Sequence, residues 1–150
     1  VPLPPFVHVE RFESLADLEG MIAGIDHDLV MVPAALSDFT FDREKGKLPS
    51  EAKVTALQLR NVPKMLPLVR ERCSRVVGFK AESGVSREEL VNEALASLKR
   101  NGLKAVVAND LRDVEEGRTR VVLVRPRKRT EMQGSKSEVA RQLIKEISKL

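Results

Sequence analysis

The feature that most constrains the fold is a repeated alternation between capped amphipathic segments and short valine-rich runs. Three segments start with a serine followed three residues later by an acid, which is the capping-box pattern of a helix N-terminus: Ser14 with Asp17, Ser86 with Glu89, and Ser135 with Glu138. Apolar residues then recur every three or four positions, as in a helix that buries one face. A fourth helix is expected to begin after Asn61, which would serve as its N-cap.

The runs between the helices are short and rich in β-branched residues, so they predict strands, most of them buried. The predicted strands comprise residues 7–9, 28–33, 55–60, 75–80, 103–108 and 119–124. Strands that alternate with helices imply right-handed crossovers. We therefore expect an α/β fold, a three-layer Rossmann-like arrangement with a mainly parallel sheet and helices on both faces. A length of 150 residues is that of one domain.

Composition excludes several classes of site. Cys73 is the only cysteine, and the two histidines, His8 and His27, are far apart, so the sequence predicts no disulfide and no protein-held metal centre. No apolar run approaches the ~18 residues of a membrane span and no signal peptide is visible, so we expect a cytoplasmic protein without membrane contact. The chain begins at Val1 rather than at methionine, which predicts a processed or trimmed piece of a longer polypeptide.

The first candidate site follows the predicted strand 28–33, because ligands of open α/β sheets bind beyond the carboxyl ends of strands. Ala34 and Ala35 are small enough to let the backbone approach a ligand, and Asp38 offers an acceptor to hydroxyls or a metal. Lys47 adds a positive charge on a glycine-containing loop. This set suits an anionic, nucleotide-like ligand, although an aspartate there is also typical of a turn or helix cap.

The basic run from Arg125 to Arg129 and the net charge of +4 favour an anionic partner. There is no tryptophan or tyrosine, and the five phenylalanines are not interleaved with the run, so a base-stacking platform for single-stranded nucleic acid is poorly supported. A solvated loop is the ordinary interpretation of such a run. The sequence also contains neither of the two common glycine-rich phosphate loops.

Four segments, in this order, resemble phosphopantothenoylcysteine synthetase, which is often the C-terminal half of the bifunctional DNA/pantothenate metabolism flavoprotein. They are A-A-L-S-D-F with G-K-L-P-S, V-V-G-F-K-A-E, V-V-A-N-D-L, and G-S-K-S-E-V-A. The similarity covers essentially all 150 residues. It implies that residues 1–150 form a single α/β domain, the C-terminal two-thirds of such a synthetase domain.

The resemblance implies a ligase of coenzyme A biosynthesis. Enzymes of this family join 4'-phosphopantothenate to L-cysteine through an acyl-nucleotide intermediate made from CTP, or from ATP in the animal enzyme, and release pyrophosphate. Mg²⁺ assists, and the enzyme is usually a homodimer. The predicted strand 55–60 is a sensible site for dimerisation, because an exposed edge strand can pair with another chain.

The resemblance also assigns roles to individual residues. Lys47 matches the flap lysine and is expected to be catalytic, since a fixed cation offsets the charge that develops on the α-phosphate. Asp38 matches an aspartate that contacts the nucleotide, with Ala34 and Ala35 beside it. Phe79 matches an aromatic residue packed on the nucleotide, although the residues alone favour a core phenylalanine at a strand end.

The remaining expectations concern the base, the triphosphate and the edge of the pocket. A four-residue segment stands where the family often has N-P-D-I-L and is expected to line the base pocket: Pro63, Lys64, Met65 and Leu66. Lys99 or Arg100 is expected to replace two lysines that contact the triphosphate in many members. Lys80, Asn109 and Asp110 are expected at the pocket edge.

Two parts of the family pattern are not found in this sequence. The glycine-rich turn and the S-N-x-S-S-G segment that holds the acyl intermediate would precede residue 1, and so would the flavin-binding decarboxylase half. We therefore expect no flavin in this segment and a chain that is catalytically incomplete by itself. The alternatives are a non-catalytic nucleotide-binding module and, less favoured, a basic nucleic-acid-binding domain that uses Arg125 to Arg129.

Overall fold

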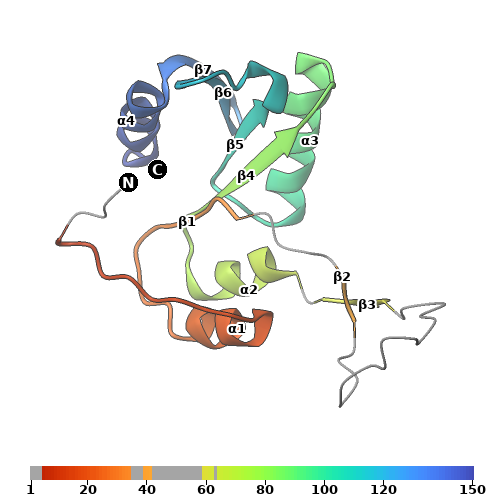
Figure 1. The fold of residues 1–150 in the computed structure, drawn as a ribbon, viewed down its shortest axis with the longest axis vertical. Helices are drawn as coiled ribbons and strands as arrows, with labels where there is room; N and C mark the ends of the chain where they lie inside the picture. Colours follow the sequence, from red (N-terminus) through yellow and green to blue (C-terminus); the bar gives the residue numbers. More distant parts are fainter. Residues whose placement is uncertain (1–4, 35–38, 42–58, 63) are drawn as a thin grey trace, which may run out of the picture.

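The computed structural model describes residues 5–34, 39–41, 59–62 and 64–150, and its centre is a five-stranded sheet (Figure 1). The strand order is β1-β4-β5-β6-β7. β1, β4 and β5 run parallel, whereas β6 is antiparallel to β5 and β7 is antiparallel to β6. The strand bounds are β1 Val30–Val32, β4 Val76–Glu82, β5 Ala105–Asp110, β6 Arg118–Arg125 and β7 Lys128–Ser135.

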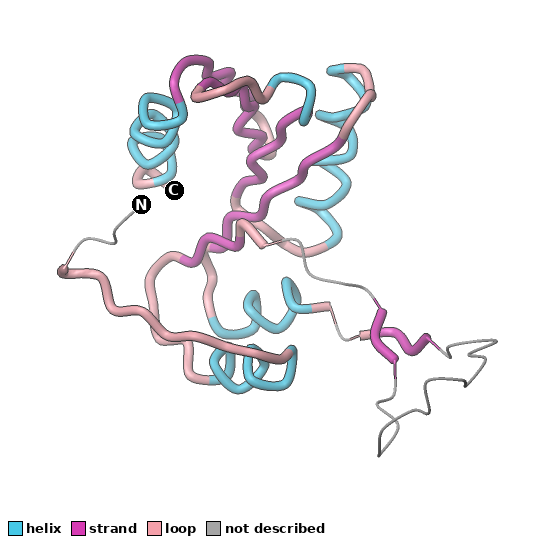
Figure 2. The backbone as a smooth tube through the Cα atoms, viewed as in Figure 1, coloured by secondary structure: helices cyan, strands magenta, loops and turns pink. Residues whose placement is uncertain are grey.

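A second, two-stranded sheet stands apart from the first (Figure 2). It pairs β2 (Phe39–Phe41) with β3 (Leu59–Asn61) in antiparallel register. β3 covers the end of the predicted strand 55–60, whose first four residues lie outside the described ranges. Asn61 lies opposite Phe39 in this ladder, so it belongs to β3 and does not cap the following helix as predicted. That helix starts instead after Lys64, which makes no side-chain capping hydrogen bond.

Helices cover both faces of the five-stranded sheet, which confirms the three-layer α/β class (Figure 1). The helices are α1 Leu15–Ala23, α2 Met65–Arg72, α3 Arg87–Arg100 and α4 Lys136–Ile147. α1, α2 and α3 pack on one face and α4 on the other. Successive residues of β5 alternate between the two cores: Val106 and Ala108 face α3, whereas Ala105 and Val107 face α4.

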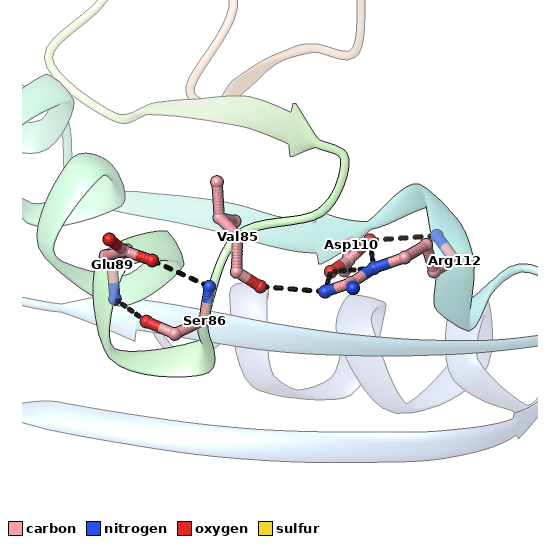
Figure 3. A network of polar contacts seen from close by, with 5 residues as sticks. All are labelled: Val85, Ser86, Glu89, Asp110 and Arg112. Carbon is pink, nitrogen blue, oxygen red and sulfur yellow. Dashed lines mark hydrogen bonds and ion pairs between the residues drawn. The ribbon is translucent and has the colours of Figure 1, made fainter.

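All three predicted capping boxes are present. In each, the serine hydroxyl accepts a hydrogen bond from the backbone N–H three residues later, and the acid accepts one from the serine N–H. The start of α3 illustrates the geometry, with 2.8 Å between Ser86 N and Glu89 Oε2 and 3.2 Å between Glu89 N and Ser86 Oγ (Figure 3). No helix within the described ranges is long and apolar enough to cross a bilayer.

The structure differs from the sequence-based prediction at three strands, the first of which is β2, a segment that was not predicted as a strand. β7 was not predicted, because in K-R-T-E-M-Q-G-S only Met132 and Gly134 are buried and the rest of this edge strand is polar. Residues 7–9 were predicted as a strand but form none, and Phe6 beside them is 86% exposed. An alternating apolar pattern does not form a strand by itself, because the backbone N–H and C=O groups need a neighbouring strand for hydrogen bonding, and no described strand pairs with residues 7–9.

Candidate functional site

The parallel strands bring several predicted residues to one edge of the sheet. β1, β4 and β5 end at the same edge because they run in the same direction. In β4 and β5 the register sets Lys80 opposite Ala108, Ala81 opposite Asn109, and Glu82 opposite Asp110. Ala34 follows β1 by two residues and is exposed. This edge is where open α/β sheets bind ligands.

Asp110 is the most tightly held group at this edge (Figure 3). Its side chain is 10% exposed and accepts hydrogen bonds from three nitrogens of Arg112: the backbone N at 2.9 Å, Nε at 3.0 Å and Nη2 at 2.7 Å. Arg112 Nη2 also donates to the carbonyl oxygen of Val85 at 2.9 Å. Asp110 therefore ties the turn after β5, which continues as a short 3₁₀ helix (Leu111–Asp113), to the loop between β4 and α3.

The hydrogen bonds from Arg112 set the charge state of Asp110. The Arg112 side chain, followed by the Arg112 backbone N–H, lowers the pKa of Asp110 from 3.8 to about 2. Arg112 was not predicted as a site residue, although an acid two residues before an arginine, at the end of a strand, is the sequence signal of such a turn. The sequence-based expectation that Asp110 shapes the pocket edge stays a prediction, and the structure adds that Asp110 holds two loops in place.

Asp110→Asn is expected to lower stability at neutral pH and to flatten its acid dependence. A carboxylate whose folded pKa is depressed stabilises the fold above its unfolded pKa, and this contribution is lost as the pH falls from about 4 toward about 2. Chemical denaturation between pH 7 and pH 2 measures the effect. Exposed Glu93→Gln on α3 is the control, and an Asp110→Asn curve parallel to the wild-type curve throughout the range would exclude this role.

A second acidic residue at the same edge is paired as well. Lys80 Nζ lies 2.6 Å from Glu82 Oε1, and both side chains are about one-third exposed, at 33% and 32%. Glu82 was not predicted, yet its spacing of two from Lys80 on a strand places both side chains on the same face. At the described part of this edge, each cation is thus matched by a carboxylate, so the edge carries little net charge of its own.

The N-terminus of α3 is also occupied by protein groups. The carboxylate of Glu89 accepts from the N–H of Ser86, and this backbone hydrogen bond is the main reason that the pKa of Glu89 is lowered. Arg87 at the first turn pairs with Glu131 of β7 at 2.8 Å, and Arg120 of β6 pairs with the same carboxylate at 3.0 Å. These contacts fasten α3 to the antiparallel end of the sheet.

The aromatic and base-pocket candidates lie against the cores. Phe79 is half-buried in β4 and packs on the core beneath α4. Met65 is 4% exposed and Leu66 is half-buried, both in the core under α1, α2 and α3, whereas Lys64 is exposed at the start of α2. Met65 is therefore buried as a whole residue and offers little surface to a ligand.

The structure does not bring the triphosphate candidates to the same edge. Lys99 and Arg100 are exposed in the last turn of α3, while α3 begins at the edge where β4 ends. A helix of 14 residues is about 21 Å long. Within one chain, Lys99 and Arg100 are therefore remote from Asn109, which is half-buried near the end of β5. Four other predicted site residues lie outside the described ranges: Ala35, Asp38, Lys47 and Pro63.

The donors needed for a protein-held metal are not grouped in the described part of the chain. No cluster of three or more histidine, cysteine, aspartate or glutamate side chains occurs there. The two carboxylates nearest the sheet edge, Glu82 and Asp110, are already engaged by Lys80 and Arg112. These residues do not fit a metal centre built from protein ligands alone.

The basic run forms the tight turn between β6 and β7 and is not an open loop. Arg125 pairs with Lys128 in the ladder, and its side chain is only 13% exposed. Arg125 Nη2 donates to Glu146 Oε2 and to Thr130 Oγ1, each at 2.9 Å. Lys149, followed by Arg125, lowers the pKa of Glu146 to about 2. The first arginine of the run therefore anchors α4 and is not free to contact a nucleic-acid backbone.

Comparison with known proteins identifies relatives along the whole chain. Residues 1–150 match the family described as DNA/pantothenate metabolism flavoprotein C-terminal domain. The coenzyme A biosynthesis bifunctional protein CoaBC of Thermococcus kodakarensis is 34% identical over 148 residues, which are 96% of this chain and 37% of that protein. The protein of the same name from Methanocaldococcus jannaschii is 33% identical over 129 residues, or 83% and 32% of the two chains. The chain thus spans about a third of the length of these relatives.

Solved structures share the fold. The DNA/pantothenate metabolism flavoprotein from Streptococcus pneumoniae superposes with a TM-score of 0.85 at 24% identity, covering 98% of this chain and 75% of that chain. The C-terminal domain of a coenzyme A biosynthesis bifunctional protein CoaBC gives 0.69 at 20% identity, over 98% and 67%. A Cab2 variant in complex with phosphopantothenate-cysteine gives 0.62 at 20% identity, over 89% and 47%.

Proposed function

This chain belongs to the DNA/pantothenate metabolism flavoprotein C-terminal domain family, and from that premise we propose that it is part of a phosphopantothenate–cysteine ligase of coenzyme A biosynthesis. The observation that carries the proposal is the match of all 150 residues to this family, together with the two relatives named as coenzyme A biosynthesis proteins. The similarity in fold to a protein bound to phosphopantothenate-cysteine supports the choice of product.

The proposed reaction has two steps. In the first, a carboxylate oxygen of 4'-phosphopantothenate attacks the α-phosphorus of CTP, and pyrophosphate leaves. In the second, the amino group of L-cysteine attacks the acyl carbon, and CMP leaves with the former carboxylate oxygen. The product is an amide, and each step expels a stable phosphate leaving group.

The first step brings two anions together, so the site needs positive charge aimed at the α-phosphate. At the described sheet edge Lys80 and Arg112 are paired with Glu82 and Asp110, so they are poorly suited to neutralise further charge. We propose that Lys47 supplies this charge. Asp38, Ala34 and Ala35 are proposed to hold the nucleotide, and Asn109 to border the pocket.

Mg²⁺ is proposed to enter with the nucleotide phosphates, since Mg²⁺ commonly binds through substrate phosphates and one or two carboxylates. No step of the proposal depends on a metal held by the described residues. CTP is our first choice of nucleotide and ATP the alternative.

The assembly is proposed to be a cytoplasmic homodimer. Completing the site would require a second copy or the family's preceding segments, because Lys99 and Arg100 lie at the far end of α3 from Asn109. Proposed partners in a longer polypeptide are the synthetase's glycine-rich segment and a flavin-binding decarboxylase domain, with residues 1–150 as the C-terminal two-thirds of the synthetase domain.

A nucleotide comparison tests the proposal on the chain as it stands. CTP with Mg²⁺ is expected to raise Tm in a concentration-dependent manner and ATP to raise it less, because a ligand that binds only the folded state stabilises it. In the protein that carries this domain, pyrophosphate release is expected to require phosphopantothenate. Pyrophosphate release that is indifferent to phosphopantothenate would contradict the ligase, and CTP binding without any turnover would indicate a non-catalytic nucleotide-binding module.

A further inference from the structure

The turn between β6 and β7 borders a hollow of about 370 Å³. Six of the described residues line it, four of them cationic: Leu95, Arg125, Pro126, Arg127, Lys128 and Arg129. None of the six was predicted around the nucleotide, although the run from Arg125 to Arg129 was expected to favour an anionic partner. We infer that this hollow, here called the turn site, binds small oligophosphate anions such as pyrophosphate and tripolyphosphate. The inference does not rest on the proposed ligase activity.

The cations of the turn site are held on a rigid frame. The β6–β7 ladder is continuous from the pair Arg118 and Ser135 to the pair Arg125 and Lys128, so only two residues close the turn. One of these is Pro126, whose ring fixes its φ angle. Cations placed on such a short hairpin lose little conformational freedom when an anion binds, which favours affinity.

Arg125 has a donor that the protein leaves unused. Its Nη2 group is satisfied by Thr130 and Glu146, but its Nε atom is buried and has no hydrogen-bond partner among the described residues. Because the Nε atom is buried, a ligand does not reach it as the side chain stands, and Arg125 contributes to the turn site through its charge. Arginine is also suited to phosphate because its planar donors match two oxygens at once.

The charges around the turn site leave an excess of cations. Glu146 is the acid paired with this cluster. Its carboxylate forms ion pairs with Arg125 and Lys149, and Lys128 Nζ lies 3.9 Å from Glu146 Oε2. Arg127 and Arg129 are exposed, and neither has an ion pair among the described residues. A ligand with several closely spaced negative charges would compensate them.

The shape of the turn site favours a small anion over a nucleic acid. Its volume of about 370 Å³ falls at the low end of pockets that hold small molecules. The cations are confined to one hairpin turn, whereas a groove for a nucleic-acid strand tracks the backbone and offers aromatic side chains for stacking. No aromatic residue is among the described residues that line the hollow, and Leu95 and Pro126 form its apolar part.

Isothermal titration of the 150-residue chain with sodium tripolyphosphate, without metal, tests the inference. The double variant Arg127→Gln/Arg129→Gln is expected to bind at least tenfold more weakly than wild type, and binding should weaken as salt is raised. Arg141→Gln/Lys145→Gln on α4 removes the same charge from exposed positions elsewhere and is expected to bind as wild type does. Unchanged Tm values verify that both variants fold.

Three results would overturn the inference. In the first, tripolyphosphate does not bind the wild-type chain. In the second, the two double variants lose affinity equally, which would mean attraction by net charge alone. In the third, a duplex of about 20 base pairs binds more tightly than tripolyphosphate and depends on Arg127 and Arg129. That result would make the turn a nucleic-acid surface, with the steep salt dependence such surfaces have.

Discussion

Lys47→Ala, made in the protein that carries this domain, is expected to lower kcat for amide formation by roughly 10²–10³ with little change in Tm. Removing one preorganised group that stabilises developing charge has an effect of about that size. The effect should fall on the first chemical step, because Lys47 is proposed to offset charge at the α-phosphate. KM for cysteine, which enters in the second step, should change little.

A matched control lies two residues away. Lys45→Ala removes the same charge from the same segment of sequence and is expected to retain most of the activity. Rapid-quench measurement of pyrophosphate formation separates the first step from later ones. Equal losses in the two variants would mean that the segment contributes only general positive charge, and full activity of Lys47→Ala would remove it from the mechanism.

Ile147→Ala is expected to destabilise the fold by about 2–5 kcal/mol, the range for removing a large buried aliphatic side chain. Ile147 is 1% exposed in the core between α4 and the sheet. The loss should appear as a lower midpoint of urea unfolding. The m-value should not change, because it depends on the surface exposed on unfolding, which this substitution alters little.

The same helix provides the control. Ile144 is 56% exposed, and Ile144→Ala is expected to change stability by no more than about 0.5 kcal/mol, as is usual for surface positions. The pair differs in burial and not in residue type. Similar midpoints for the two variants would contradict the placement of α4 over the sheet and therefore the third layer of the fold.

Those features of the fold that depend on local patterns could be predicted from the sequence. The capping boxes at Ser14, Ser86 and Ser135 lie where predicted, because a cap is made within four residues and needs no distant partner. β7 could not be found this way, since an edge strand buries one face only in part and its polar sequence resembles a loop. Asn61 was misassigned because its pairing with β2 depends on a contact across more than 20 residues.

The candidate site was predicted less completely, for electrostatic reasons. Strand order brings Lys80, Asn109 and Asp110 to one edge, as the carboxyl ends of parallel strands predict. The spacing of two in sequence allows Lys80 to pair with Glu82 and Asp110 with Arg112, but only the structure shows that these pairs form. The sequence placed Lys99 and Arg100 at the pocket, yet they lie in the last turn of α3, at the opposite end of that helix from the sheet edge where β4 ends.

The central claim is our proposal that the protein carrying this domain activates the carboxylate of phosphopantothenate by transferring a nucleotidyl group to it before cysteine reacts. The most direct measurement is a single-turnover experiment with phosphopantothenate, CTP and Mg²⁺ but without cysteine, in the protein that carries this domain. We predict a burst of pyrophosphate close to one per active site, followed by CMP release only when cysteine is added. No pyrophosphate in the absence of cysteine, or pyrophosphate and CMP released together, would contradict the account.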